Sequence, residues 1–599
     1  NKIVRIQDGL GSVNPWQTLL SNGYQKDNRN NINTTLRLNY DLSSLLTKGL
    51  SVHGSIAYDS YYYSRKKYSK TFPYYLARRD AEDPDYIYLI PQSEESIWSV
   101  STGWDKNRKV YMEFGIDYNR TFGLHKTTAL ILYNQSKYYS PSLQYYVPNA
   151  YQGLVGRLTY EYASRYLAEF NMGYNGTENF AKGKRFGFFP AVSLGWVISE
   201  EKFFPKNNIV KYLKVRGSYG EVGNDQIGGD RFLYLPSSYG AASDSGVNKY
   251  NFGLASNPYT SLMIVENKIG NPDLTWEKAK KMNVGVDINL FNNCLTASFD
   301  IFKEKRNNIL ANRSTSPMII GANLPAYNFG EMENRGWEMD LNFRHHIQDF
   351  HYWARFNYSF ARNEIIYMDE VQKRYDYQMT TGRRKNQFFG LIFDGYYNSW
   401  EEINALDRPK SSWSGNQLQP GDVKYVDVNQ DGVIDDYDMV PIGYTPVPEI
   451  IYGFSFGAQY KGFDFSILFQ GADNVSIKYF GRSMWPFAKG EESAKSLIKE
   501  RWTQERYEAG EKITFPRLSL NPNGETDHNY RPSTLWIRDA SYLRLKNLEV
   551  GYTFTGGFVK RLNLNSVRLY FNGSNLFTWT DVVDLDPEAP SRSGNVEIN

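Results

Sequence analysis

The chain has 599 residues, and its 68 basic and 65 acidic side chains leave a formal net charge of only +3. This balance excludes the electrostatic excess expected of a nucleic-acid-binding protein. The longest apolar runs fall far short of the roughly 18 residues that a membrane-spanning helix needs. Aromatic residues make up 16% of the chain and 48 residues are glycine, a composition that favours an all-β fold.

Paired segments of about ten residues, in which apolar and polar side chains alternate, recur along the chain. In residues 154–162, for example, Leu154, Leu158 and Tyr160 share one face and Arg157 and Glu161 the other. Such alternation is typical of membrane β-barrel strands, which show one face to lipid and the other to a polar lumen. The sequence therefore predicts a large antiparallel transmembrane β-barrel. About sixteen strands are recognisable, at residues 32–40, 50–58, 110–118, 126–133, 154–162, 166–174, 186–196, 212–219, 284–290, 295–301, 337–343, 352–360, 450–460, 463–470, 542–554 and 567–574.

The connections between these strands are of two kinds. Tight turns join the members of many pairs, whereas long polar stretches separate others. Short turns on one rim and long loops on the other are typical of an outer-membrane barrel, whose long loops lie outside the cell. Helical spacing in residues 494–507 predicts a short amphipathic helix within the last long loop. The long loops are expected at residues 60–109, 221–276, 363–449 and 472–541.

The sharpest local motif spans residues 427–438 and reproduces the spacing of a calcium-binding loop. The short side chain of Asp438 replaces the usual glutamate at the last position and would reach an ion with one oxygen. We expect a structural Ca²⁺ ion, with Mg²⁺ as the alternative, in an insertion at residues 420–441 of an extracellular loop. An Asx-rich turn without an ion is the competing interpretation. The predicted ligands are Asp427, Asn429, Asp431, the backbone carbonyl of Val433, Asp435 and Asp438.

No catalytic constellation stands out, so the sequence predicts a protein that is not an enzyme, and no catalytic residue is named. Aromatic residues crowd the long loops, where their faces can stack on sugar rings or on apolar peptide side chains. Packing of one loop against another is the alternative for each of them. The candidates for contact with a ligand or partner are Trp400, Trp413, Trp485, Phe487, Tyr74 and Tyr75.

Several motifs, taken in order along the chain, resemble the SusC/RagA-type TonB-dependent transporters. The resemblance covers residues 8–587 and implies an outer-membrane barrel of about 22 strands in a Gram-negative bacterium. Among these motifs are Pro-Gly-Asp-Val-Lys-Tyr at 420–425, Gly-Asn-Pro-Asp-Leu-Thr-Trp-Glu at 270–277, Asn-Arg-Gly-Trp-Glu at 334–338 and Gly-Ser-Asn-Leu-Phe-Thr at 573–578.

The resemblance also implies segments outside residues 1–599. A signal peptide, an amino-terminal extension, a TonB box, a plug and the first strands would precede residue 1, and a last strand would follow residue 599. We therefore expect residues 1–599 to be a truncated barrel domain.

The function implied by the resemblance is import of oligosaccharides or oligopeptides together with a SusD-like surface lipoprotein that acts as a lid. TonB-ExbB-ExbD would act through the plug, and two SusC–SusD pairs could form a dimer in the lipid membrane. A passive outer-membrane barrel or a surface adhesin, without energised transport, is the alternative.

Overall fold

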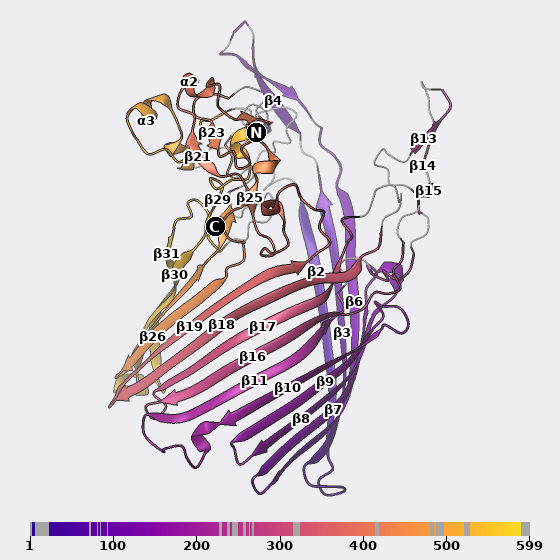
Figure 1. The fold of residues 1–599 in the computed structure, drawn as a ribbon, viewed down its shortest axis with the longest axis vertical. Helices are drawn as coiled ribbons and strands as arrows, with labels where there is room; N and C mark the ends of the chain where they lie inside the picture. Colours follow the sequence, from indigo (N-terminus) through magenta and orange to yellow (C-terminus); the bar gives the residue numbers. More distant parts are fainter. Residues whose placement is uncertain are drawn as a thin grey trace.

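A computed structural model describes residues 3–5 and 23–588, apart from 71–72, 81, 84, 93, 227–230, 237–239, 242–248, 255–258, 263, 266–268, 316–323, 414–417, 480–483, 487–495 and 520–526. Its main element is one sheet of 16 strands, in the order β2-β3-β6-β7-β8-β9-β10-β11-β16-β17-β18-β19-β26-β27-β30-β31. Every strand is antiparallel to its neighbours, and the strands run obliquely across the molecule (Figure 1). The all-β class and the predicted number of strands are confirmed.

Each predicted strand coincides with one strand of this sheet. The strands are β2 (Tyr24–Asp41), β3 (Leu50–Ser69), β6 (Ser99–Phe122), β7 (His125–Tyr139), β8 (Asn149–Tyr162), β9 (Tyr166–Thr177), β10 (Phe186–Val197), β11 (Val210–Asn224), β16 (Glu277–Leu290), β17 (Leu295–Ala311), β18 (Tyr327–Ile347), β19 (Phe350–Tyr367), β26 (Ile450–Tyr460), β27 (Phe463–Asp473), β30 (Tyr542–Phe554) and β31 (Val567–Thr580).

The hairpins at one end of the sheet close through tight turns with left-handed backbone. Lys461 and Gly462 have φ angles of 45° and 93° and connect β26 to β27. Two successive positive φ angles form a turn whose twist matches that of the flanking strands. Ala163 and Ser164, with φ angles of 51° and 56°, begin the turn between β8 and β9. These turns fix the register in which side chains alternate between the two faces of the sheet.

The first long loop is shorter than the sequence predicts, because β3 continues to Ser69 and β6 begins at Ser99. The two strands remain paired along this whole length, from Leu50 opposite Tyr118 to Ser69 opposite Ser99. Residues 60–69 and 99–109 carry little apolar alternation. Alternation of side chains reflects what the two faces of a strand contact, whereas strand pairing reflects backbone hydrogen bonds. The strands can therefore extend beyond the segments in which apolar and polar residues alternate.

The predicted helix at residues 494–507 is wrong as a single element. The structure has a 3₁₀ helix, η7 (Ser496–Glu500), and a separate short helix, α3 (Gln504–Glu508). The Thr503 side chain accepts a hydrogen bond from the Arg506 amide and caps α3, so Thr503 separates the two pieces. Within the described part of the chain, none of the helices has the length and hydropathy needed to cross a bilayer.

The remaining elements are short, and all of them except β1, which precedes β2, lie in the connections of the large sheet. The helices are α2 (Trp400–Ile403) and α4 (Gly557–Arg561), and the 3₁₀ helices are η1 (Gln144–Tyr146), η2 (Ile198–Glu200), η4 (Asp376–Gln378), η5 (Asp436–Asp438) and η8 (Asp527–Tyr530). The strands are β1 (Ile3–Arg5), β4 (Tyr74–Arg79), β5 (Ile87–Pro91), β12 (Gly240–Ala241), β13 (Lys249–Phe252), β14 (Tyr259–Leu262), β15 (Ile264–Val265), β20 (Phe389–Gly390), β21 (Phe393–Tyr396), β22 (Lys410–Ser411), β23 (Val423–Tyr425), β24 (Val433–Ile434), β25 (Val440–Pro441), β28 (Ser476–Lys478) and β29 (Ile537–Asp539).

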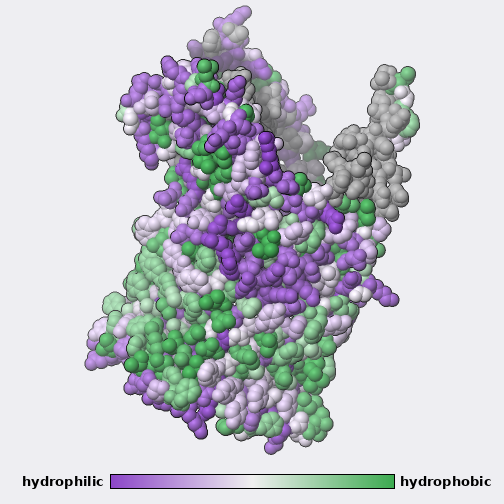
Figure 2. All heavy atoms as spheres, in the orientation of Figure 1, coloured by the Kyte–Doolittle hydropathy of each residue, from purple (hydrophilic) through white to green (hydrophobic). Residues whose placement is uncertain are grey.

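One face of the large sheet, which we call the apolar face, exposes large hydrophobic side chains to the surroundings. Leu38 is 69% exposed, Leu194 63% and Ile301 56%. A soluble protein rarely leaves so broad a hydrophobic area uncovered. Figure 2 shows hydrophobic residues gathered over the lower part of the sheet and a mostly hydrophilic zone above them. This arrangement matches a sheet whose outer face lies in lipid.

Candidate functional site

The opposite face of the sheet, which we call the charged face, carries ion pairs between neighbouring strands. Arg216 on β11 donates from Nη1 to Asp300 at 2.6 Å and from Nε to Asp287 at 3.1 Å. Arg216 and residues around it, including Glu169 and Asn283, line a hollow of about 660 Å³. A charged, hydrogen-bonded face opposite a hydrophobic one is what a polar lumen requires. Further pairs on this face are Arg37–Glu113, Arg157–Glu169, Lys281–Glu304 and Arg568–Asp464.

The largest hydrophobic core lies outside the sheet, in the loops at one end. These loops connect β19 to β26 and β27 to β30, and the segment after β31 joins them (Figure 1). We call this unit the rim module. Loops that are far apart in sequence thus pack together into one body at the end of the sheet. Its buried core consists of Leu391, Tyr396, Val423, Tyr425, Ile434, Val475, Ile477, Tyr479, Met484, Trp502, Phe515, Tyr530, Leu535, Trp536, Ala540 and Val582.

A buried polar cluster joins the two main loops of the rim module. The Asp422 carboxylate is 1% exposed and accepts hydrogen bonds from Arg517 Nε at 2.6 Å and from Asn529 Nδ2 at 2.8 Å. His528 contacts the Val423 carbonyl through Nε2 and the Ser411 hydroxyl through Nδ1, each at 2.7 Å. Burial lowers the pKa of His528, so the neutral ring is favoured. Its neutral form can donate to the carbonyl and accept from the hydroxyl, which satisfies both nitrogens.

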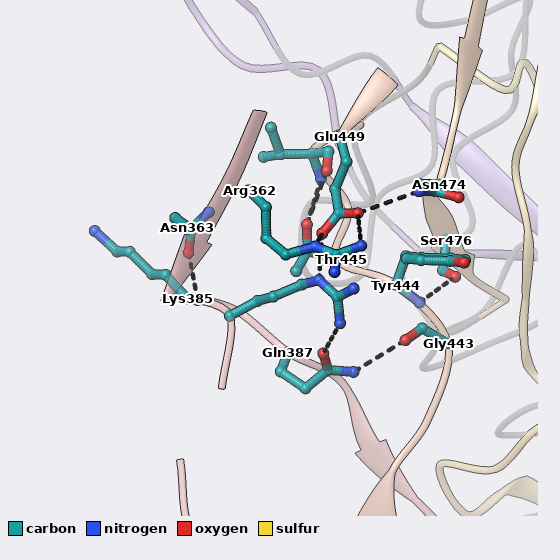
Figure 3. Close-up of polar contacts among 12 residues, drawn as sticks. Arg362, Asn363, Lys385, Gln387, Gly443, Tyr444, Thr445, Glu449, Asn474 and Ser476 are labelled. Atoms are coloured by element: carbon teal, nitrogen blue, oxygen red, sulfur yellow. Dashed lines mark hydrogen bonds and ion pairs between the residues drawn. The ribbon is translucent and has the colours of Figure 1, made fainter. Parts of the chain in front are cut away.

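A second polar cluster connects the rim module to the strands (Figure 3). The Glu449 side chain is 4% exposed and accepts two hydrogen bonds from Arg362, at 3.0 and 2.8 Å, and one from Arg384. Asn474, which follows β27, donates to the same carboxylate at 3.2 Å. Burial alone would raise the pKa of Glu449, but the hydrogen bonds from the two arginines outweigh it and lower the pKa.

Further hydrogen bonds of side chains extend this second cluster. Arg384 Nη1 donates to Gln387, whose amide group donates to the Gly443 carbonyl at 3.1 Å. The Tyr444 amide donates to the Ser476 hydroxyl at 2.9 Å. The cluster therefore fixes the loop-side end of β19, the start of β26 and the end of β27 relative to the loops that follow them.

The predicted calcium loop lies in the rim module and is closed by hydrogen bonds between its own side chains and amides. Asp427 accepts from the Gln430 and Gly432 amides at 2.7 and 2.8 Å, and Asp438 accepts from the Val428 and Asp435 amides at 2.8 and 2.9 Å. In the described ranges no three His, Cys, Asp or Glu side chains converge closely enough to hold a metal ion. The ion-binding interpretation therefore stays a prediction.

One feature of this loop suits a cation. Asp438 is completely buried and forms no ion pair with any residue that the structure describes. Burial raises the pKa of Asp438, and the negative charge of Asp427 adds to this rise, although three backbone hydrogen bonds oppose it. A cation between Asp427 and Asp438 would offset the cost of burying a carboxylate beside another. The donor set thus fits a hard cation, although the side chains would have to turn toward it.

The six aromatic candidates occupy different environments. Trp400 begins α2 and is 55% exposed. Trp413 and Trp485 pack against the core of the rim module, where Arg531 lies over the Trp413 ring and Tyr530 lies 4.9 Å from Trp485. Tyr74 and Tyr75 are half-buried in β4, which pairs with β1 and β5. Phe487 lies outside the described residues.

One segment of β26 has the residue spacing of a nucleophile elbow. Residues Gly453-Phe454-Ser455-Phe456-Gly457 have the spacing Gly-x-Ser-x-Gly. A nucleophile elbow requires a sharp turn from a strand into a helix. Ser455 instead lies mid-strand, opposite Arg355 on β19 and Leu468 on β27. The pattern is therefore part of the barrel wall.

Neither polar cluster was found from the sequence. Asp422 and Arg517 are 95 residues apart, and Glu449 and Arg362 are 87 residues apart. Charged residues are common in all long loops of this chain, so no local signal distinguishes these from solvated ones. The two clusters become visible only when the loops are folded together.

These features together define the class of protein. A large antiparallel sheet with a hydrophobic outer face, a charged inner face, tight turns at one end and long loops at the other is an outer-membrane β-barrel. Residues 5–576 match the family model "TonB dependent receptor-like, beta-barrel", and the chain belongs to this family. Family membership confirms the predicted localisation in the outer membrane and the prediction that the protein is not an enzyme.

Curated relatives support the same assignment. TonB-dependent receptor P3 of Formosa agariphila is 29% identical over 450 residues, which cover 74% of this chain and 42% of that protein. TonB-dependent receptor SusC of Bacteroides thetaiotaomicron is 28% identical over 453 residues, which cover 75% of this chain and 42% of that protein. The chain thus spans less than half the length of the curated relatives it matches.

Solved structures agree with the fold. The RagAB peptide importer in its open-open state superimposes with a TM-score of 0.69 at 20% identity, over 96% of this chain and 59% of that one. Another structure, of the RagAB peptide transporter, gives a TM-score of 0.66 at 19% identity, over 94% and 59% of the two chains. The predicted resemblance to SusC/RagA-type barrels is confirmed.

Proposed function

We propose that this chain forms the barrel wall of a transporter that imports oligosaccharides or oligopeptides across the outer membrane in a TonB-dependent manner. The observation that carries the proposal is the family match over residues 5–576, together with the likeness to SusC and to the RagAB importer. The charged inner face agrees with a polar route for hydrated substrates, which do not cross lipid unaided.

The substrate is either a glycan or a peptide. The name of RagAB states a peptide substrate for that protein, and aromatic loop residues can serve both ligand types. Uptake of fluorescent oligosaccharides and oligopeptides should be compared between cells that carry the gene and cells from which it has been deleted. We expect one of the two classes to lose uptake on deletion and to regain it on complementation.

Energised import and a passive barrel differ in one measurable property. Removal of TonB, or collapse of the proton-motive force, should abolish uptake while leaving the barrel in the membrane. Uptake that continues unchanged in cells without TonB would support a passive barrel. Binding of cells to surfaces without any uptake would support an adhesin.

We further propose that a SusD-like surface lipoprotein covers the rim module and that two such pairs can associate. The rim module supports this part of the proposal, because it is a packed body at the barrel mouth with an exposed aromatic residue, Trp400. Affinity purification of the whole protein from outer membranes, followed by native mass spectrometry, would reveal the lipoprotein and the number of pairs. Recovery of the barrel alone, under conditions that preserve other membrane complexes, would contradict it.

We also propose that residues 427–438 bind Ca²⁺ or Mg²⁺ and so stabilise the rim module. The buried Asp438 carboxylate, which lies beside Asp427 and has no cationic partner in the described chain, supports this assignment. Metal analysis of the purified protein, after dialysis against each ion, would identify the ion.

A further inference from the structure

The apolar face of the first four strands ends in a row of cations. Lys26 on β2, Lys66 on β3, Lys106 and Arg108 on β6 and Lys137 on β7 all alternate in step with the exposed hydrophobic residues of their strands. The registers place Lys26 opposite Lys66 and Lys137 opposite Val110. All five side chains are exposed, and they point to the same side of the sheet as the lipid-facing residues. We call them the cationic row.

The cationic row begins where the hydrophobic row stops. On β6 the apolar face shows Val110, Met112, Phe114, Ile116 and Tyr118 in succession. Residues 110–118 have the length that a tilted strand needs to cross the hydrocarbon core, about 9–11 residues.

Arg108 and Lys106 occupy the next two positions of the same face, on the side of the long loops. They therefore lie at the level of the lipid headgroups in the outer leaflet.

Apart from one another, these cations have neutral and largely aromatic neighbours on the apolar face. Lys106 lies over the Trp104 ring at 5.1 Å, and Arg108 lies over the Tyr139 ring at 4.6 Å. Within the described residues no carboxylate forms an ion pair with any member of the row. On this face, positions 24–34 of β2, 58–68 of β3, 100–110 of β6 and 133–139 of β7 hold no Asp or Glu.

The corresponding zone of other strands differs in charge. Lys278 and Lys280 on β16 lie 3.7 and 3.9 Å from Glu221, and Lys303 on β17 lies 2.8 Å from Glu333. Those lysines thus have carboxylate partners supplied by the protein. By contrast, the five cations on β2, β3, β6 and β7 have no carboxylate partner among the described residues, whereas β18 carries a single exposed cation of this kind, Arg335.

We propose that Lys106, Arg108 and Lys137 form a binding site for the phosphate groups of an outer-leaflet glycolipid. Same-face neighbours on a strand, and diagonal neighbours across two strands, are about 7 Å apart, so the three side chains can contact one phosphorylated headgroup. Arginine can bind a phosphate through two parallel hydrogen bonds, and lysine adds point charges. The hydrophobic row directly below would contact the acyl chains of the same molecule.

The position of the row favours a lipid over a soluble protein as its occupant. The cations continue a surface that already faces the membrane, and anionic headgroups are the charges available at that depth. Trp104 and Tyr139 are residue types enriched at the membrane interface, where one end of the ring is apolar and the other wet. Lys26 and Lys66 lie further from the hydrophobic row and would face acidic sugars of the same glycolipid.

The test uses the whole protein purified from outer membranes and compares two triple variants. Lys106→Gln, Arg108→Gln and Lys137→Gln together remove the three proposed phosphate contacts. Lys278→Gln, Lys280→Gln and Lys303→Gln together form the control, because they remove the same charge from the same face. Heat-modifiable migration on denaturing gels would verify that each barrel is folded.

The probes are purified lipid A and enzymatically dephosphorylated lipid A, with binding measured by native mass spectrometry in detergent. We expect the first variant to bind lipid A at least about tenfold more weakly than the unaltered protein and the control, because each basic residue contributes substantially to anionic lipid binding. Dephosphorylated lipid A should bind all three proteins equally.

Equal lipid A binding by all three proteins would overturn the proposal, and so would equal binding of the two lipids by the unaltered protein. A change in oligomeric state of the first variant, with unchanged lipid A binding, would instead assign the row to a protein interface.

Discussion

The substitution Glu449→Gln should destabilise the junction between the rim module and the strands by an amount that can be estimated from the contacts of Glu449. The substitution keeps the shape of the side chain but removes the charge that Arg362 and Arg384 contact. Losing one partner of a buried ion pair costs about 3–5 kcal/mol. Arg362 is 42% exposed, so solvent can compensate part of this loss, and we expect about 2 kcal/mol.

The measurement is amide hydrogen exchange of the detergent-purified protein. A cost of about 2 kcal/mol corresponds to about 30-fold more frequent local opening. Peptides that cover residues 382–387 and 442–449 should exchange faster by this factor, whereas peptides from the middle of β16 and β17 should not change. Glu401→Gln is the control, because Glu401 is an exposed carboxylate in the same loop. Identical exchange in the Glu449 variant and the control would refute the reasoning.

The lowered pKa of Glu449 adds a pH dependence with a definite sign. A carboxyl group whose folded-state pKa lies below its unfolded value stabilises the folded state fully above the unfolded value, about 4.3. This stabilisation is lost as the pH falls through the lowered pKa. Protection of residues 442–449 in the unaltered protein should therefore persist at pH 6 and decrease below about pH 4. Glu449→Gln should lack this decrease.

Three further variants test the rim module. Asp427→Ala combined with Asp431→Ala should abolish calcium retention and remove the calcium-dependent rise in the melting temperature of the module; full calcium content in this variant would sink the metal assignment. Gly421→Ala should destabilise the module by about 2–3 kcal/mol in a denaturant titration, because Gly421 has a φ of 93° and a Cβ would lie 2.5 Å from the Trp502 ring. Trp400→Ala should leave stability unchanged and weaken lipoprotein or substrate binding several-fold in a pull-down or calorimetric assay, because this side chain is 55% exposed.

The strands were predictable because each one carries its own signal. In β8, Leu154, Leu158 and Tyr160 are exposed on the apolar face, as their two-residue period predicts, while Arg157 pairs with Glu169 on the other face. Lipid imposes this alternation on every strand separately, so no contact between distant residues is needed to recognise it. The turn residues Lys461 and Gly462 confirmed the register locally.

The rim module was not predictable, because its core comes from segments with no period. Val423, Tyr479, Phe515 and Trp536 are all nearly or fully buried there, although each lies in a loop that reads as polar. Their burial depends on contacts between two loops and the segment after β31. Trp413 and Trp485 were not distinguishable from Trp400 in the sequence either, because all three lie in polar loops, but Trp413 and Trp485 pack against this core.

The strands β3 and β6 are longer than predicted, and the extra length locates the border of the membrane. Alternation stops at Tyr58 and at Val110, whereas backbone pairing continues to Ser69 and Ser99. Lipid causes the alternation and hydrogen bonding causes the pairing, so the point where the first stops and the second continues marks the outer border of the hydrocarbon core. Arg108 follows that border directly. The loss of alternation, which made the strand ends unpredictable, therefore locates the headgroup region. It also gives the depth at which a phosphorylated lipid would contact the cationic row.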